Sequence, residues 1–199
     1  EIFVEETSTG SFDVGLGFDS YEGATFISGL REKNIMGDGR ELKFTINTSP
    51  DNSKYIFGIV EPYIFNKKAD FIYNISFSEQ DLSSSASYEL SSFTNNVGFR
   101  YELADQISHT AILEYRLKDY TITDDSTASD SVKKLSGNNA DILLNNTLTY
   151  NNLDSFLRPT KGSYIKFDNG ISPSTNDENG YFKNLISYKK YYKMNTNIL

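Results

Sequence analysis

The sequence alternates between apolar and polar residues along most of its length. In the clearest stretch, 11–19, phenylalanine, valine and leucine alternate with serine, aspartate and glycine. The same rhythm recurs in 41–47, 70–78, 96–103 and 110–118, and more weakly in 24–33, 54–65, 140–150, 162–172 and 181–193. A period of two is typical of strands with one apolar face, and helical spacing is almost absent. The pattern therefore predicts an all-β fold of about ten strands.

The segments between these strands contain turn residues rather than helix signals. Compact turns are expected at 34–40, 66–68 and 104–106, and looser acidic loops at 48–54, 80–87, 122–139 and 173–180. Consecutive strands joined in this way form an antiparallel meander. We expect one continuous domain over 11–199, preceded by a junction at 1–10.

Alternation alone does not decide which face of the sheet contacts water. A soluble sandwich turns its apolar face inward, whereas a membrane barrel turns that face outward to lipid. The charged and glycine-rich polar face, and the alternation of compact turns with longer loops, favour the N-terminal part of a transmembrane β-barrel. The residues predicted to face lipid on the convex side are Phe12, Leu16, Phe44, Phe71, Phe99 and Leu113.

Composition narrows the choice of function. The 14 Tyr and 14 Phe provide much of the apolar surface, and no apolar run is long enough for a membrane-spanning helix. The net charge of −8, without a basic cluster, argues against nucleic-acid binding. Because the chain has no Cys, disulfides, Cys-type zinc sites and thiol catalysis are excluded.

Candidate catalytic and metal-binding residues are few. His109 is the single histidine, and its neighbours on a strand point to opposite faces, so we expect a histidine at the rim rather than part of a hydrolase triad. Acidic loop residues could attract divalent cations, but they lack the spacing of a calcium loop, and solvated loops are the simpler interpretation. These residues are Asp119, Asp124, Asp125, Asp130, Asp177 and Glu178. We predict no enzymatic activity, no cofactor and no metal.

Four phrases of the sequence are more specific than the alternation. They are the stretch 4–18, the turn 31–40, the segment 61–65 and the stretch 148–162. In this order and at this spacing they resemble the BamA family of outer-membrane protein assembly factors, the bacterial surface antigen family. In that family the first phrase joins the last periplasmic POTRA domain to the first barrel strand. Ser8 and Asn151 stand where the family usually has Pro and Asp, and the Arg-Gly pair of the family's inner-loop signature is absent here.

The resemblance implies a location in the bacterial outer membrane and a fragment of a longer protein. It implies that residues 1–10 end a POTRA domain and that residues 11–199 begin an incomplete barrel. The implied partners are outer-membrane lipids, unfolded β-barrel client proteins and the lipoproteins of an assembly complex.

The residues to which the resemblance assigns roles fall into two groups. Under it, strand 11–19 is one side of a lateral seam that receives client strands, and the polar face of that strand carries Ser11, Asp13, Gly15, Gly17 and Asp19. Close packing of the two glycines against a neighbouring strand is the alternative explanation. The turn motifs carry Asn34, Gly37, Gly39, Glu61, Pro62, Pro159, Thr160 and Gly162. For these a purely structural role is the simpler interpretation, because glycine permits positive φ and proline ends a strand.

Two functions remain open at this point. The first is an assembly factor that folds client barrels into the outer membrane through its first strand, by adding client strands to an unpaired edge. The alternative is a TamA-like or two-partner-secretion translocation barrel, and a passive porin is a weaker candidate. Repeats of the POTRA type in the upstream sequence would separate these possibilities.

Overall fold

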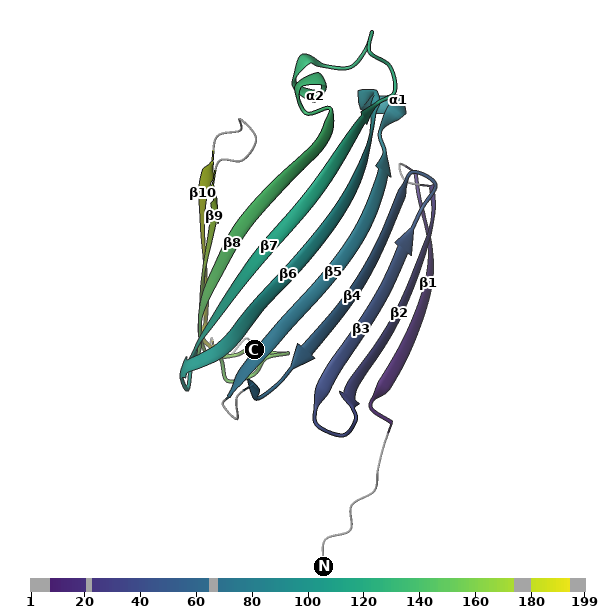
Figure 1. The fold of residues 1–199 in the computed structure, drawn as a ribbon. Helices are drawn as coiled ribbons and strands as arrows, with labels where there is room; N and C mark the ends of the chain where they lie inside the picture. The colour runs from purple at the N-terminus through teal and green to yellow at the C-terminus, as the bar shows by residue number, and fades with distance from the viewer. Residues whose placement is uncertain (1–7, 21–22, 65–67, 174–179, 194–199) are drawn as a thin grey trace, which may run out of the picture.

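The computed structural model describes residues 8–20, 23–64, 68–173 and 180–193. These residues form a single curved sheet of ten antiparallel strands in sequential order, from β1 to β10 (Figure 1). The strands are β1 (Gly10–Asp19), β2 (Gly23–Ile35), β3 (Arg40–Thr48), β4 (Asn52–Glu61), β5 (Ala69–Asp81), β6 (Tyr88–Ala104), β7 (Ile107–Ile122), β8 (Gly137–Asn151), β9 (Gly162–Ser172) and β10 (Tyr181–Tyr191). The predicted all-β meander of about ten strands is confirmed.

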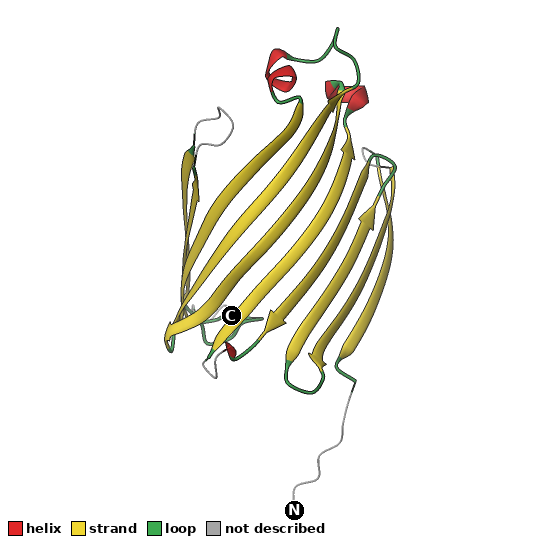
Figure 2. Ribbon diagram, in the orientation of Figure 1, coloured by secondary structure: helices red, strands yellow, loops and turns green. Residues whose placement is uncertain are grey.

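The sheet does not close on itself. β1 pairs with β2 and β10 pairs with β9, so each of the two outermost strands has one strand neighbour among the described residues. Figure 2 shows the strands as an open, tilted wall, with the start of β1 at its lower edge. This is the arrangement expected for part of a barrel wall.

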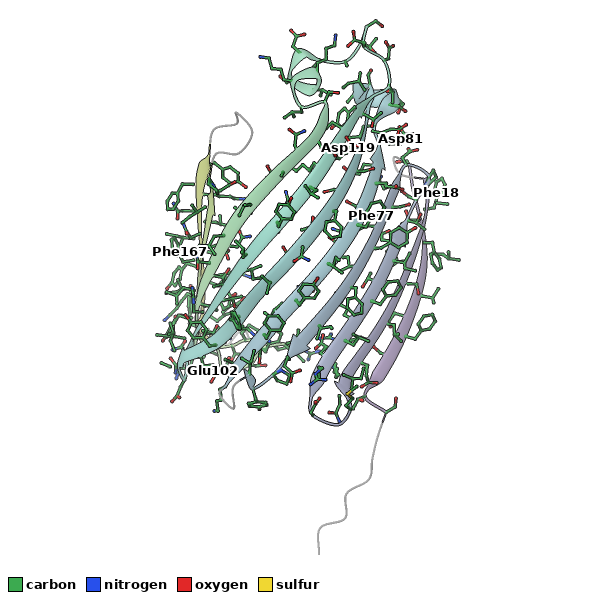
Figure 3. All side chains as sticks on the ribbon, viewed as in Figure 1. Phe18, Phe77, Asp81, Glu102, Asp119 and Phe167 are labelled. Carbon is green, nitrogen blue, oxygen red and sulfur yellow. The ribbon has the colours of Figure 1, made fainter. Side chains whose placement is uncertain are left out.

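The apolar residues lie on the outer face of the curve. Phe18 and Phe167, near the two ends of the sheet, point away from its interior, and Phe77 lies between them on the same face (Figure 3). The rings of Phe71 and Phe99 contact each other across β5 and β6, with centroids 5.5 Å apart. No second sheet covers this face in the described part of the chain, so an apolar sandwich core is absent.

The inner face is polar and carries ion pairs between neighbouring strands. Lys118 Nζ lies 2.6 Å from Asp141, and Arg100 donates from its Nε to Asp70 at 2.8 Å. Such pairs are stable in contact with water but costly in lipid. The inner face is therefore the hydrated side, and the outer face is the one that suits hydrocarbon.

Strands β6, β7 and β8 have 17, 16 and 15 residues and are longer than the pattern predicted. Segment 80–87 was expected to be a loop, but residues through Asp81 still belong to β5. At the end of β5 and the start of β6, the outward-facing residues are polar, as the pairing of Asp81 with Glu89 shows. The hairpin of β5 and β6 therefore extends beyond the apolar band, and its polar end suits contact with water rather than lipid.

Two other connections also differ from the prediction. Loop 48–54 is a short hairpin, in which the Ser49 amide donates to the Asn52 carbonyl at 2.7 Å. The longer connections contain two short helices, α1 (Ser83–Ala86) and α2 (Asp130–Lys134), and the Ser129 hydroxyl accepts from the Val132 amide as an N-cap. No helix in the described part of the chain is long and apolar enough to cross a membrane.

Candidate functional site: the first strand and the lower turns

The candidate site is β1 together with the turns at the end of the sheet where β1 begins, the lower end in Figure 1. β1 runs in continuous register with β2, from Gly10 opposite Glu32 to Asp19 opposite Gly23. Its other edge has no strand partner among the described residues. The backbone N–H and C=O groups along that edge are the ones through which a further strand of the barrel wall would pair with β1.

The two faces of β1 differ sharply in chemistry. Phe12, Leu16 and Phe18 point outward and are 67%, 84% and 83% exposed. The inner face carries Ser11, Asp13, Gly15 and Gly17, as the alternation predicted. Asp19 lies in the strand, but its side chain is outside what the structure describes. β1 therefore combines a bulky apolar outer face with a thin inner face.

The space around the two inner-face glycines does not require glycine. A Cβ at Gly15 would lie 4.0 Å from the Cβ of Ile27, and one at Gly17 would lie 4.0 Å from the Cβ of Thr25. Both distances are ordinary contacts, so packing against β2 does not require glycine at either position. Gly98 on β6 is different, because a Cβ there would overlap the Ala111 carbonyl oxygen.

This difference predicts that a glycine-to-alanine substitution lowers stability at Gly98 but hardly changes it at Gly17. Gly98→Ala should lower the free energy of unfolding by about 1–3 kcal/mol, because the backbone of β7 must move. Gly17→Ala should change it by about 0.5 kcal/mol or less, because nothing has to move. Urea titration of the full protein in detergent or lipid checks both values. Equal losses would contradict the space assigned around Gly17.

The segment just before β1 is attached to the end of β2. The Thr9 hydroxyl donates to the Glu32 carboxylate, and the same carboxylate accepts from the Asn34 amide at 2.9 Å. The Lys33 amide donates to the Thr9 carbonyl. Most of the predicted junction, residues 1–7, lies outside the described residues. The described part shows that β1 starts from an anchored point.

The turn between β2 and β3 uses glycine for its backbone conformation. Gly37 and Gly39 have φ values of 82° and 79°. Asn34 Oδ1 accepts from the Gly39 amide at 2.6 Å and the Asn34 carbonyl accepts from the Gly37 amide at 3.1 Å, so the turn is closed by its own residues. These contacts support a structural role for the motif.

The structure brings Glu61 and Pro62 to this turn. The Glu61 carboxylate accepts from Arg40 Nε, and Arg40 also lies 3.1 Å from Asp38. A Cβ at Gly39 would lie 3.6 Å from the Pro62 ring. The register places Glu61 opposite Phe71 on the outer face, so the ion pair with Arg40 lies at the rim of that face.

The connection from β8 to β9 is organised by Asp154, a residue that the sequence analysis did not select. Its carboxylate accepts from the Thr160 amide at 2.9 Å, the Lys161 amide at 3.1 Å and the Thr160 hydroxyl at 2.6 Å. These bonds, led by the hydroxyl, lower the pKa of Asp154 from 3.8 to about 2. Gly162 has a φ of 113°, and a Cβ there would overlap the Asn152 carbonyl, so only glycine fits.

The low pKa predicts a pH-dependent loop. Because the folded pKa lies below 3.8, the Asp154 carboxylate stabilises the loop above about pH 4, and this contribution is lost as pH falls towards 2. Asp154→Ala should therefore lower the hydrogen-exchange protection factors of the Thr160 and Lys161 amides at neutral pH. Asp105→Ala, in the adjacent turn, is the control and should leave them unchanged. Unchanged protection in Asp154→Ala would contradict the assigned bonds.

Residues 34–199 of the chain match the protein-family model of the Omp85 superfamily domain. The chain belongs to the Omp85 superfamily. Proteins of this superfamily insert or translocate proteins at the bacterial outer membrane as non-enzymatic assembly factors, and the outer membrane is the location of this Omp85 chain.

A solved structure shares the fold of this Omp85 chain. It is BamA from Haemophilus ducreyi lacking POTRA domains 1–3, with a TM-score of 0.66 and 19% sequence identity. The alignment covers 87% of this chain and 36% of that chain. The Omp85 chain thus spans about a third of the length of the protein whose fold it shares.

The other candidate residues of the Omp85 chain, His109 and the acidic loop residues, make contacts that are typical of structural roles. His109 is on the outer face at the rim, where its Nδ1 lies 2.8 Å from the Tyr101 hydroxyl. The Asp124 carboxylate accepts from the Ser126 amide at 2.9 Å, and the Asp125 carboxylate lies 3.4 Å from Lys133 Nζ. Asp177 and Glu178 fall outside the described residues. Within the described ranges, no group of His, Cys, Asp or Glu is arranged to hold a metal ion.

Proposed function

We propose that this Omp85 chain is part of a BamA-like factor that inserts β-barrel client proteins into the outer membrane through β1. The observation that carries the proposal is the chemistry of β1 in a chain that matches the Omp85 superfamily domain: its outer face is apolar and its inner face carries Gly15 and Gly17. We call the edge of β1 that does not pair with β2 the lateral seam. A client strand that pairs there gains backbone hydrogen bonds that a lone strand in lipid lacks.

The chemistry of β1 supports the seam in two ways. Its outer face is apolar, so a client strand added beside it extends a surface that is already suited to lipid. Its inner face is thin, so few side chains interlock with a neighbour and separation of paired strands is cheaper there than elsewhere. The anchoring of Thr9 to Glu32 gives this strand a fixed starting point.

The proposal includes parts of the protein beyond the described wall. Residues 1–10 would end a POTRA domain in the periplasm, and residues 11–199 would begin the barrel. The partners would be outer-membrane lipids, unfolded barrel clients and assembly lipoproteins. The lower turns, including Pro159 and Thr160, would then face the periplasm and serve as structural connections.

A TamA-like or two-partner-secretion translocation barrel is the second candidate, because the superfamily includes both tasks and the same edge would serve either. Depletion of the full protein in its native host separates them. An assembly factor predicts a broad loss of many outer-membrane barrels, measured by quantitative proteomics of the outer membrane. Loss restricted to one secreted substrate or a small subset would favour the translocation branch, and no loss of either kind would contradict both.

A further inference from the structure

Three asparagines form a continuous row across the outer face of the last three strands. Asn146 on β8 is in register with Asn169 on β9, which is in register with Asn184 on β10. Asn169 Nδ2 donates to Asn184 Oδ1 at 2.9 Å. We call these three residues the asparagine row.

The asparagine row lies inside the apolar band rather than at its border. Each member is flanked, two residues away on either side along its strand, by apolar side chains that point outward. These flanking residues are Leu144, Leu148, Phe167, Ile171, Phe182 and Ile186, all between 36% and 70% exposed. Tyr150 marks the lower end of the band on β8, and four tilted strand residues place Asn146 about 10 Å above it. This depth is within the hydrocarbon.

The hydrogen-bonding groups of the row are mostly unused. Three amide side chains offer six N–H donors and three carbonyl acceptors, and one side-chain bond joins two of them. Asn146 has no side-chain partner among the described residues. Elsewhere on the outer face, Asn95 is paired with the Tyr73 hydroxyl at 2.9 Å, which shows how an isolated amide is satisfied within the wall. The neighbour of Asn146 on β7 is Ala111, whose side chain can form no hydrogen bond.

Unpaired amides in hydrocarbon are costly, and polar groups at this depth mark interaction sites. We propose that the asparagine row is a contact site for a second copy of this protein within the membrane. An amide both donates and accepts, so the row is complementary to itself. It is also uncharged, so two copies bring no like charges together.

The two-fold symmetry of a dimer in a membrane is compatible with this pairing. A two-fold axis along the membrane normal keeps every residue at its own depth, so the row of one copy meets the row of the other at the same level. The tilted rows then cross, and Asn169, the central member, meets its own counterpart. Polar side chains that bond across a lipid-exposed contact stabilise association of membrane segments.

The test is a crosslinking experiment on the full protein in its native outer membrane. Asn169→Cys is introduced after any cysteine elsewhere in the full protein has been changed to serine; the present chain has none. A lipid-permeable oxidant should then give a disulfide-linked dimer of twice the mass, since the two Cα atoms come within about 7 Å. Phe44→Cys, also outward-facing but on β3, is the matched control and should stay monomeric.

A second variant tests the amides themselves. Asn146→Leu and Asn184→Leu, combined with Asn169→Cys, keep the surface apolar and should reduce the dimer yield about tenfold. Heat-modifiable migration on gels confirms that each variant is folded. The proposal is overturned by equal crosslinking of Asn169→Cys and Phe44→Cys, by a product that contains a different protein, or by a folded Asn169→Cys protein that stays monomeric because lipid or water covers the row.

Discussion

An arginine in place of Leu113 is expected to destabilise the full barrel by about 2–4 kcal/mol, because the side chain would enter the hydrocarbon near the midplane. Leu113 points outward, is 46% exposed and lies in register with Val97 and Leu144. It has only apolar neighbours in that row, so nothing in the wall would pair with the guanidinium. Urea titration of folding into lipid vesicles measures the loss.

Thr110→Arg on the same strand is the control for this prediction. Thr110 lies on the inner face, in register with Thr147 and Arg100. Its replacement would enter water, and the neighbouring Arg100 is already paired with Asp70. The expected cost is about 0.5 kcal/mol or less. Equal losses in Leu113→Arg and Thr110→Arg would show that the faces are assigned wrongly.

Asp13→Cys in the full protein is expected to form a disulfide with a cysteine in the terminal strand of a client during assembly. Asp13 is in β1, in register with Gly29 on one side and next to the lateral seam on the other. A client strand paired at the seam would bring the two Cα atoms within about 7 Å. Non-reducing gels of stalled assembly intermediates would show the product.

Cysteines on interior strands are the matched controls. Thr45 on β3 and Asn74 on β5 also face inward, but both of these strands are paired along both edges. Thr45→Cys and Asn74→Cys should trap no client. If these variants and Asp13→Cys trap clients equally, or if none does, β1 has only a structural role and the proposed seam fails.

Much of the wall followed from local pattern. The alternation in 11–19 predicted both faces of β1, and the turn residues predicted the conformation around Gly37 and Gly39. The pattern did not predict the lengths of β6 and β7, because the alternation changes phase at their outer ends, where Leu90 and Tyr120 face inward and Glu89 faces outward. Hairpin pairing continues these strands beyond the apolar band of the outer face.

The candidate site was predictable only in part. Gly162 was selected from its motif, but Asp154 was missed, although it accepts three bonds from Thr160 and Lys161. An aspartate in a loop is common, and no spacing rule singles this one out. The pairing of Arg40 with Glu61 joins residues on different strands, so it depends on how β3 and β4 are aligned.

The sequence alone determined the strand content, the meander order and which residues share a face of each strand, because these depend on geometry over a few neighbouring residues. Only the tertiary structure decided the register between strands, which sets the residues that meet at one depth. Asn146, Asn169 and Asn184 each interrupt an apolar face on their own strand, and pairing over long range aligns them. The pairing of β1 with β2 is likewise a property of the assembled sheet, since no residue in the strand itself determines which strand lies beside it.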